Sequence, residues 1–241
     1  PSATPPGGGA AAGVHPPGPH PPGAPAAGYR YFETDVHTTA DGRLVAFHDA
    51  TLDRVTDATG RISALPWSEV RRARVGGTEP LPLFEELLEE FPEARWNVDL
   101  KAEPALAPLL WLIRRTGAWD RVCVGSFSEA RVARAHRIAG PRLATSYGVR
   151  GVLGLRLRSW GIPAALRTGA VCAQVPERQG GIPVVDARFV RTAHARGLQV
   201  HVWTVNEPDR MRRLLDLGVD GIMTDHIETL RTVLSERGAW S

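Results

Sequence analysis

The sequence predicts an α/β protein with a TIM-like (β/α)8 barrel, and three observations support this. From residue 29 onward, short apolar segments rich in valine alternate with segments of helical periodicity. The chain has 241 residues, close to the size of about 250 residues that is usual for such barrels. Acidic residues follow several of the apolar segments, at the strand ends where barrel enzymes build their active sites. We therefore expect one barrel domain over residues 29–241.

Eight segments are interpreted as strands because they are short and apolar and end at turn residues. They are residues 29–36, 44–47, 95–100, 121–126, 142–146, 170–175, 198–205 and 221–224. Residues 44–47 follow the preceding strand too closely for a crossover helix, so they are assigned to an excursion beyond the barrel. Seven barrel strands remain. The missing one should be the first strand, together with its helix.

Helical periodicity fills the intervals between these strands, often with recognisable end signals. The predicted helices are residues 66–74, 81–91, 104–116, 128–138, 186–195, 208–217 and 227–237. Ser128 precedes an acidic first turn, as an N-cap does. Gly197 and Gly218 follow two helices, where glycine commonly ends them.

Residues 1–28 differ from the rest of the chain. Pro, Gly and Ala supply 23 of these 28 positions, and no Asp, Glu, Lys or Arg occurs among them. Such a segment buries little apolar surface and interrupts both helices and strands, so we predict that it is disordered.

Composition restricts the function classes. Hydrophobic residues make up 43% of the chain and the net charge is only +3, with arginines interspersed among acids on the predicted helices. No aromatic-rich basic patch of the kind that binds single-stranded nucleic acid is evident. Cys123 and Cys172 lie in apolar segments without metal-ligand spacing, which indicates buried thiols in a reducing compartment. No segment resembles a membrane span or a secretory signal, so we expect a cytoplasmic protein without stable membrane insertion. The oligomeric state is left open.

Three acidic residues are candidate metal ligands. Glu33 and Asp35 share one face of a strand because side chains alternate, and Asp99 ends another strand. A lone carboxylate usually caps a helix or pairs with an arginine. Three at matching strand ends favour a site for Mg²⁺ or Ca²⁺, which prefer oxygen ligands.

Two basic groups accompany these acids. His48 follows an apolar segment after the Asp41-Gly42 turn and is a candidate proton donor. Lys101 shares the face of Asp99 and is a candidate for binding a phosphate oxygen, although it could also merely balance the acids. Trp203 stands near a strand end and is a candidate substrate contact, with core packing as the alternative. Four further residues have open roles: His37, Gln174, Glu177 and His201.

From Tyr29 to the C-terminus the chain resembles the glycerophosphodiester phosphodiesterase family. The motifs that carry the resemblance are Glu33-Thr34-Asp35-Val36, Asp41-Gly42, Phe47-His48-Asp49, Leu52-Asp53-Arg54, Asn97-Val98-Asp99-Leu100-Lys101, Val202-Trp203-Thr204 and Gly218-Val219-Asp220-Gly221. The resemblance implies metal-dependent hydrolysis of a glycerophosphodiester to an alcohol and glycerol 3-phosphate. It assigns Glu33 and Asp35 as metal ligands and His48 as one of two catalytic histidines. Asp99 stands where the family commonly has glutamate.

The chain departs from the family at its N-terminus. Family members begin with a strand ending in His-Arg-Gly, followed by Pro-Glu-Asn, and neither motif is present. We therefore expect this chain to hydrolyse its substrate poorly, and a metal- and phosphodiester-binding paralogue without catalysis is the alternative. Three explanations of residues 1–28 remain open. The reading frame is shifted or wrongly started, the protein is a degenerate paralogue, or a partner supplies the missing strand. A third class, a metal-dependent aldolase or enolising enzyme, is disfavoured by the His48-Asp49 pair.

Overall fold

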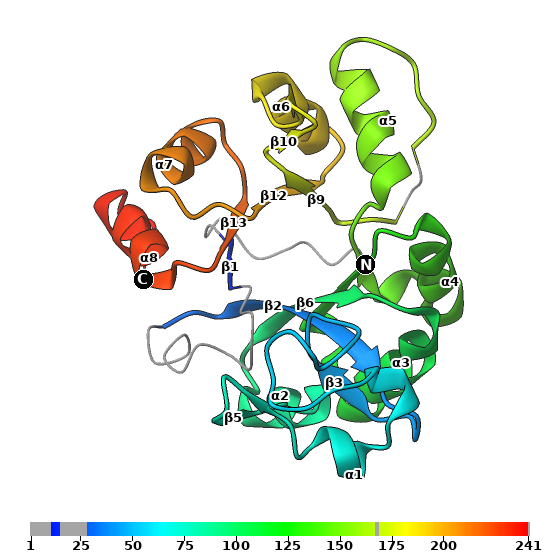
Figure 1. The fold of residues 1–241 in the computed structure, drawn as a ribbon. Coiled ribbons are helices and arrows are strands. Elements are labelled where there is room, and N and C mark those ends of the chain that lie inside the picture. Colours follow the sequence, from blue (N-terminus) through cyan, green and yellow to red (C-terminus); the bar gives the residue numbers. More distant parts are fainter. Residues whose placement is uncertain (1–10, 15–27, 167–168, 241) are drawn as a thin grey trace.

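The computed structural model describes residues 11–14, 28–166 and 169–240, and these form a barrel of parallel strands surrounded by helices (Figure 1). The barrel strands are β1 (Ala11–Val14), β2 (Tyr31–Thr38), β6 (Arg95–Leu100), β7 (Val122–Gly125), β8 (Ala144–Thr145), β9 (Cys172–Pro176), β12 (Gln199–Trp203) and β13 (Gly221–Thr224). They pair in parallel in two hydrogen-bonded sheets, with the order β2-β6-β7-β8 in one and β9-β12-β13-β1 in the other. The predicted fold class is confirmed.

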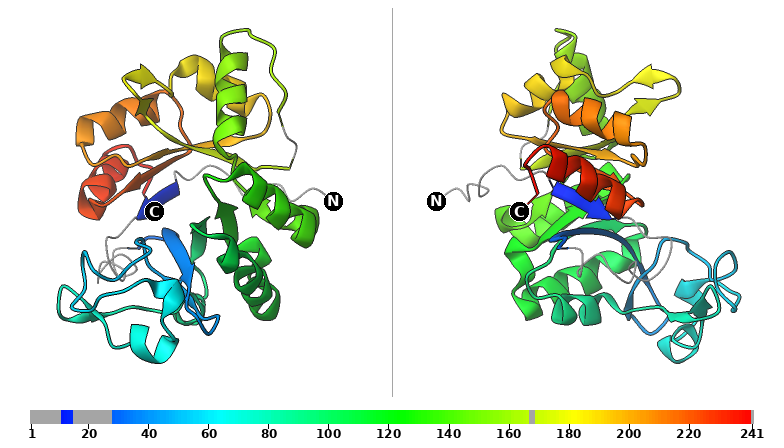
Figure 2. Two further views of the ribbon diagram at one scale, coloured as in Figure 1. Left: turned by 45° about the vertical axis from the view of Figure 1, so that its right-hand side comes forward. Right: turned by 90° about the vertical axis from the view of Figure 1, so that its left-hand side faces the viewer.

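Two seams close the barrel. At one seam, Ser146 beyond β8 forms an isolated parallel bridge with Cys172 at the start of β9. At the other, β1 lies beside β2 without a continuous hydrogen-bonded ladder between them. Figure 2 shows β1, in dark blue, between the C-terminal half of the barrel and β2.

The prediction of a barrel without a first strand is wrong for residues 11–14. Ala11 to Val14 pair in register with Gly221 to Thr224 of β13. The composition of the segment led to the error, because its prolines and glycines indicated disorder. Residues 7–15 nevertheless contain no proline, so each has a backbone N–H that can join a ladder. The remaining residues of the segment, 1–10 and 15–27, lie outside the described residues.

An excursion follows β2, as predicted. β3 (Leu44–Ala46) returns antiparallel to β2, and a small antiparallel pair follows, β4 (Arg74–Val75) with β5 (Glu79–Pro80). These segments enclose a separate apolar cluster that includes Phe47, Leu52 and Ile62. A second pair, β10 (Arg178–Gln179) with β11 (Ile182–Pro183), follows β9. The excursion therefore has its own core, which fixes the loop after β3.

Helices cover the outside of the barrel (Figure 1). They are α1 (Trp67–Val70), α2 (Phe84–Glu90), α3 (Leu106–Thr116), α4 (Glu129–Ala139), α5 (Val149–Ser159), α6 (Ala187–His194), α7 (Pro208–Asp216) and α8 (Ile227–Glu236). Single 3-10 turns occur at Ile62–Ala64, Glu103–Ala105, Ala118–Asp120 and Gly140–Arg142. Ser128 caps α4 as predicted, accepting a hydrogen bond from Arg131 N. No described helix has the length and apolarity required to cross a bilayer.

Helix α5 was not predicted. It contains Gly151 and Gly154, and glycine lowers helix propensity by about 1 kcal/mol per residue relative to alanine. Both glycines serve packing. A Cβ added at Gly151 would lie 2.7 Å from the Tyr147 ring, and one at Gly154 would lie 2.8 Å from Leu166. The close approach of Tyr147 and Leu166 therefore explains why α5 has glycines at these two positions, and the glycines explain why the helix was not predicted.

Alternation along β6 separates the core from the barrel interior. Trp96, Val98 and Leu100 are fully buried in the apolar layer between strands and helices. Asn97 and Asp99 project to the other side, in register with Glu33 and Asp35 of β2. The polar side chains of two neighbouring strands thus meet inside the barrel.

Candidate active site

Lys101 lies between two carboxylates at the ends of β2 and β6. Its Nζ is 2.8 Å from Asp35 Oδ1 and 2.9 Å from Asp99 Oδ2, and the Asp35 side chain is only 2% exposed. Burial alone would lower the pKa of Lys101, but the two carboxylates outweigh burial and raise this pKa above its usual value. Lys101 therefore remains a cation throughout the physiological pH range.

His48 stands beside this cluster with one ring nitrogen already bound. Its Nδ1 is 2.6 Å from Asp49 Oδ1, while Nε2 lies 3.9 Å from Asp35 Oδ2. Arg54 Nε and Nη2 hold Asp49 at 2.6 and 3.1 Å, and this hydrogen bonding lowers the pKa of Asp49 to about 2. The ionised Asp49 selects the tautomer in which Nδ1 carries the proton. Nε2 is then the nitrogen available for proton transfer.

The loop that carries His48 is held by buried groups on both sides. Phe47 packs in the excursion core, and its N–H donates to Asp35 O over 3.0 Å. His37 Nε2 lies 3.0 Å from His48 O, and burial lowers the pKa of His37, which favours a neutral ring that donates this hydrogen bond. His37 thus positions the backbone of His48. The described partners of the Asp49 carboxylate are the side chains of His48 and Arg54.

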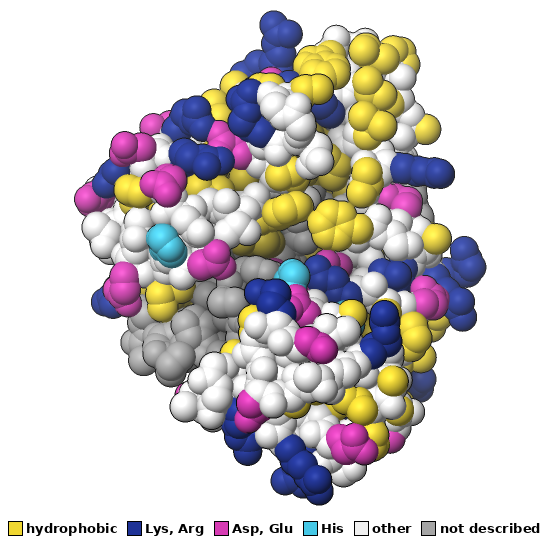
Figure 3. All heavy atoms as spheres, in the orientation of Figure 1, with side chains coloured by type: hydrophobic (Ala, Val, Ile, Leu, Met, Phe, Trp, Pro, Cys, Tyr) yellow, Lys and Arg dark blue, Asp and Glu magenta, His cyan; other side chains and the backbone are white. Residues whose placement is uncertain are grey.

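An aromatic rim borders the charged cluster. Phe127, which follows β7, is 63% exposed, and its ring centroid is 5.8 Å from Lys101 Nζ. The Trp203 ring meets Phe127 edge to face at 5.9 Å. The face drawn in Figure 3 is hollowed near its centre, where charged side chains and a histidine lie opposite hydrophobic groups. Trp203 thus lies beside Phe127 at the border of the cluster, and its contact with a substrate stays a prediction. Phe127 was missed because an isolated phenylalanine in a loop carries no sequence signal.

The end of β6 is fixed by its neighbours. Ser126 Oγ donates to Leu100 O over 2.9 Å, and Arg131 Nη1 reaches both Leu100 O and Ser126 Oγ. These bonds satisfy the carbonyl directly before Lys101. Lys101 is thereby presented from a rigid strand end, which suits a residue that must hold a substrate group in place.

The residues with open roles divide between site and scaffold. Glu177 is buried and pairs with Arg210 and Arg213 of α7, so it anchors a helix. Gln174 lies in the barrel interior beside Gly125, where an added Cβ would be 3.2 Å from Gln174 Oε1. His201 also lines the interior, and burial lowers its pKa to about 4, so it is neutral near pH 7. The free thiols Cys123 and Cys172 are 3.9 Å apart in the same interior.

The three predicted metal ligands occupy adjoining positions on two strands. Asp35 and Asp99 are register partners, and Glu33 lies one pleat before Asp35 and is buried. No group of three or more His, Cys, Asp or Glu among the described residues has a spacing that could hold a metal ion. Asp99 Oδ1 is nevertheless buried without a hydrogen-bond partner among these residues. An oxygen-only donor set with one unsatisfied carboxylate oxygen fits a hard divalent cation.

Comparison with known proteins identifies the family. The profile of the glycerophosphoryl diester phosphodiesterase family matches residues 23–229. A probable glycerophosphodiester phosphodiesterase 2 of Mycobacterium tuberculosis is 42% identical over 221 residues, covering 88% of this chain and 82% of the relative. A glycerophosphodiester phosphodiesterase of Caldanaerobacter subterraneus is 29% identical over 220 residues, covering 86% of each chain.

Solved structures agree in fold. A putative glycerophosphoryl diester phosphodiesterase from Silicibacter pomeroyi superposes with a TM-score of 0.81 at 24% identity, covering 97% of this chain and 96% of that one. A phosphodiesterase from Oleispira antarctica, solved with the product sn-glycerol-3-phosphate, gives 0.73 at 21% identity, with 88% and 87% covered. With the relatives above, these matches establish that the chain belongs to the glycerophosphoryl diester phosphodiesterase family, an enzyme family of phosphoric diester hydrolases.

Proposed function

We propose that this protein hydrolyses glycerophosphodiesters, with a divalent metal, to an alcohol and glycerol 3-phosphate. The observation that carries the proposal is the single cluster in which Lys101 joins Asp35 and Asp99 beside the His48–Asp49 pair. The cluster combines a fixed cation for a phosphate oxygen, carboxylates for a metal and a histidine for proton transfer. Glycerol 3-phosphate as the product is supported by its presence in the related structure from Oleispira antarctica.

His48 is assigned the proton transfer at Nε2. In the reaction, water adds to phosphorus, the P–O bond to the alcohol breaks, and the leaving oxygen takes a proton. Asp49 and Arg54 orient the ring, so that Nε2 faces the cluster around Asp35. A positioned general acid of this kind contributes typically about 10²–10⁴-fold to the rate.

Lys101 is assigned to the phosphate. Its ammonium is fixed by two carboxylates, and its side chain is 25% exposed, which leaves it accessible to an anionic substrate. Stabilisation of charge that develops on phosphoryl oxygens is worth most from a group that is already oriented. The Phe127–Trp203 rim supplies an apolar wall for the glycerol or alcohol portion.

Glu33, Asp35 and Asp99 are assigned to Mg²⁺ or Ca²⁺. When bound, such an ion polarises the phosphoryl oxygens. Calorimetric titration with each ion tests the assignment without turnover. We expect saturable binding that is weakened by Glu33→Gln and by Asp99→Asn. Binding that neither substitution changes would contradict the assigned ligands.

Hydrolysis itself is tested by a coupled assay for glycerol 3-phosphate released from glycerophosphocholine. We expect metal-dependent release that His48→Ala lowers by about 10²–10⁴-fold. His194→Ala is the matched control, because His194 lies at the end of α6 and pairs with Asp220 outside the cluster. Equal losses in both variants would contradict the role of His48.

A binding protein without turnover is the second candidate. It is favoured by the described cluster, which brings one histidine, His48, to the carboxylates and Lys101, whereas the family divides acid and base work between two histidines. It predicts calorimetric binding of metal and glycerophosphocholine with no glycerol 3-phosphate released on long incubation.

A further inference from the structure

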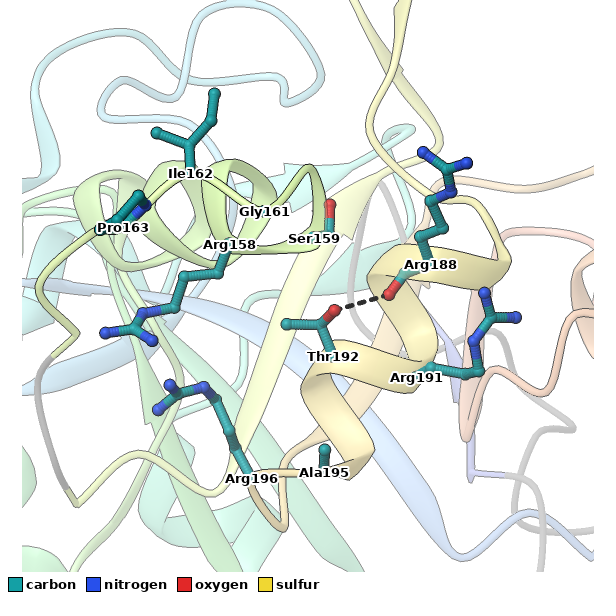
Figure 4. Close-up of a pocket in the computed structure, with 10 residues that line it drawn as sticks. All are labelled: Arg158, Ser159, Gly161, Ile162, Pro163, Arg188, Arg191, Thr192, Ala195 and Arg196. Carbon is teal, nitrogen blue, oxygen red and sulfur yellow. Dashed lines mark hydrogen bonds between the residues drawn. The ribbon is translucent and has the colours of Figure 1, made fainter.

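Helices α5 and α6 enclose a basic groove on the outside of the barrel. Its volume is about 970 Å³, and four arginines line it: Arg158, Arg188, Arg191 and Arg196. Figure 4 shows Arg158 and Arg196 turned toward the same space, while Arg188 and Arg191 extend from the other side of α6. The like charges of Arg158 and Arg196, which lie close together, favour an anionic ligand, and Arg188 and Arg191 add positive charge to the same surface.

These four arginines have no carboxylate partner within the described part of the chain. Arg158 donates only to the carbonyl of Ala164, and none of the four forms an ion pair there. Arginines of α7 differ, because Arg210 and Arg213 both pair with Glu177. The arginines of the groove are therefore not neutralised by carboxylates in the described part of the chain, whereas Arg210 and Arg213 of α7 are.

The sequence explains this difference. Residues 130–206 contain twelve arginines but only two acidic residues, Glu177 and Asp186. Both acids are engaged, Glu177 with the arginines of α7 and Asp186 with Arg156 over 2.8 Å. This segment is thus rich in arginine, although the net charge of the whole chain is only +3.

Exposed apolar side chains occur on α5 and directly after it, and one of them, Ile162, also lines the groove. Val149 and Leu153, one turn apart on α5, are 57% and 56% exposed, and Trp160 and Ile162 after the helix are each 47% exposed. Hydrophobic side chains gather over the region of α5 in Figure 3. We call these four residues and the four arginines of the groove the α5–α6 surface.

We propose that the α5–α6 surface docks this protein on anionic phospholipid bilayers. Arginine heads bind lipid phosphates, and tryptophan with aliphatic side chains inserts at the level of the headgroups. A soluble polyanion such as nucleic acid would use the arginines but would gain nothing from exposed Val149, Leu153 and Ile162. The combination therefore favours a lipid surface, and the docking does not depend on catalytic activity.

Co-sedimentation with vesicles of phosphatidylcholine alone, or with 30% phosphatidylglycerol, tests the proposal on the full chain. We expect binding to the anionic vesicles that salt weakens, and little binding to the neutral ones. Each basic residue near an anionic surface strengthens binding about fivefold. Arg191→Glu with Arg196→Glu should therefore weaken partitioning by at least about 25-fold.

The matched control reverses the same charge elsewhere. Arg71 and Arg72 are exposed at the end of α1, which lies at the opposite side of the molecule from α5 and α6 (Figure 1). Arg71→Glu with Arg72→Glu should leave vesicle binding almost unchanged. Trp160→Ala should weaken binding to anionic vesicles at high salt, where the apolar contribution dominates. Circular dichroism and thermal unfolding establish that each variant is folded.

Three results would overturn the proposal. One is equal partitioning on neutral and anionic vesicles, and another is equal loss in the Arg191/Arg196 and Arg71/Arg72 variants. The third is binding to single-stranded DNA or inorganic polyphosphate without any binding to vesicles, which would identify a soluble polyanion as the ligand.

Discussion

Replacing Lys101 tests the central electrostatic feature of the site. Lys101 is the only lysine in the chain, and the other 28 basic residues are arginines. Lys101→Met keeps most of the side-chain volume but removes the charge that joins Asp35 and Asp99. We expect the variant to lose about 3 kcal/mol of unfolding free energy without divalent ions.

The magnitude follows from the geometry. At 2.8 and 2.9 Å, and with an effective dielectric constant of about 20, each ion pair has a Coulomb energy of roughly 6 kcal/mol before desolvation. Removing one partner of a buried pair costs about 3–5 kcal/mol net. Lys101 is 25% exposed, which places the loss at the lower end. For a domain of this size, about 3 kcal/mol lowers Tm by roughly 6–12 °C.

Divalent cations should restore part of this loss. A metal bound by Asp35 and Asp99 replaces the missing positive charge and stabilises the folded state by mass action. Urea unfolding followed by tryptophan fluorescence, with and without Mg²⁺ or Ca²⁺, measures the effect, and Lys101→Arg is the charge-retaining control. A loss below about 1 kcal/mol would refute the reasoning, because removal of an engaged buried partner costs more. No stabilisation of either protein by Mg²⁺ or Ca²⁺ would refute the proposed cation site.

Three further predictions concern the site loop, the first strand and the turnover of the chain. Arg54 lowers the pKa of Asp49 to about 2, so the contribution of ionised Asp49 to the unfolding free energy is present above about pH 4 and is lost as the pH falls toward 2. Asp49→Asn should therefore flatten the dependence of the unfolding free energy on pH across this interval, as measured by urea unfolding. An unchanged dependence would exclude the interaction. Successive backbone N–H groups of a strand point to opposite edges, so one of Ala12 and Gly13 directs its N–H at β13. The double variant Ala12→Pro with Gly13→Pro therefore removes a donor of this ladder. Calorimetry should show a Tm lower by roughly 3 °C or more. The chain should release glycerol 3-phosphate at least about three orders of magnitude more slowly than a family member that carries both motifs. A comparable rate would show that the missing motifs are dispensable.

Local periodicity explains what could be predicted. The alternation of side chains in a strand predicted that Glu33 and Asp35 share one face of their strand and that Asp99 and Lys101 share one face of theirs. The parallel register of β2 and β6 then brings Asp35 opposite Asp99. The boundaries of β6 and β13 match the predicted ranges because their apolar segments end sharply at polar residues.

Contacts between distant segments explain what could not be predicted. β1 forms because its backbone pairs with the edge of β13. The local sequence of β1, within a segment rich in proline and glycine, does not predict this pairing. Helix α5 tolerates its glycines because Tyr147 and Leu166 approach them closely. Phe127 borders the site through its contacts with Lys101, which follows β6, and with Trp203 at the end of β12. Each case is decided by tertiary packing, which overrides local propensity.

The two seams of the barrel have a consequence for how the protein folds and opens. Ala11 and Gly221 are register partners although they lie about 210 residues apart in the chain. Forming this pair closes a loop of nearly the whole chain, which costs entropy, so β1 joins its sheet late in folding and the seam between β1 and β2 closes with it. The opposite seam depends on an isolated bridge between Ser146 and Cys172. Amide hydrogens along the two seams, between β1 and β2 and between β8 and β9, should therefore exchange with solvent before those inside either sheet, and the barrel should open as two halves.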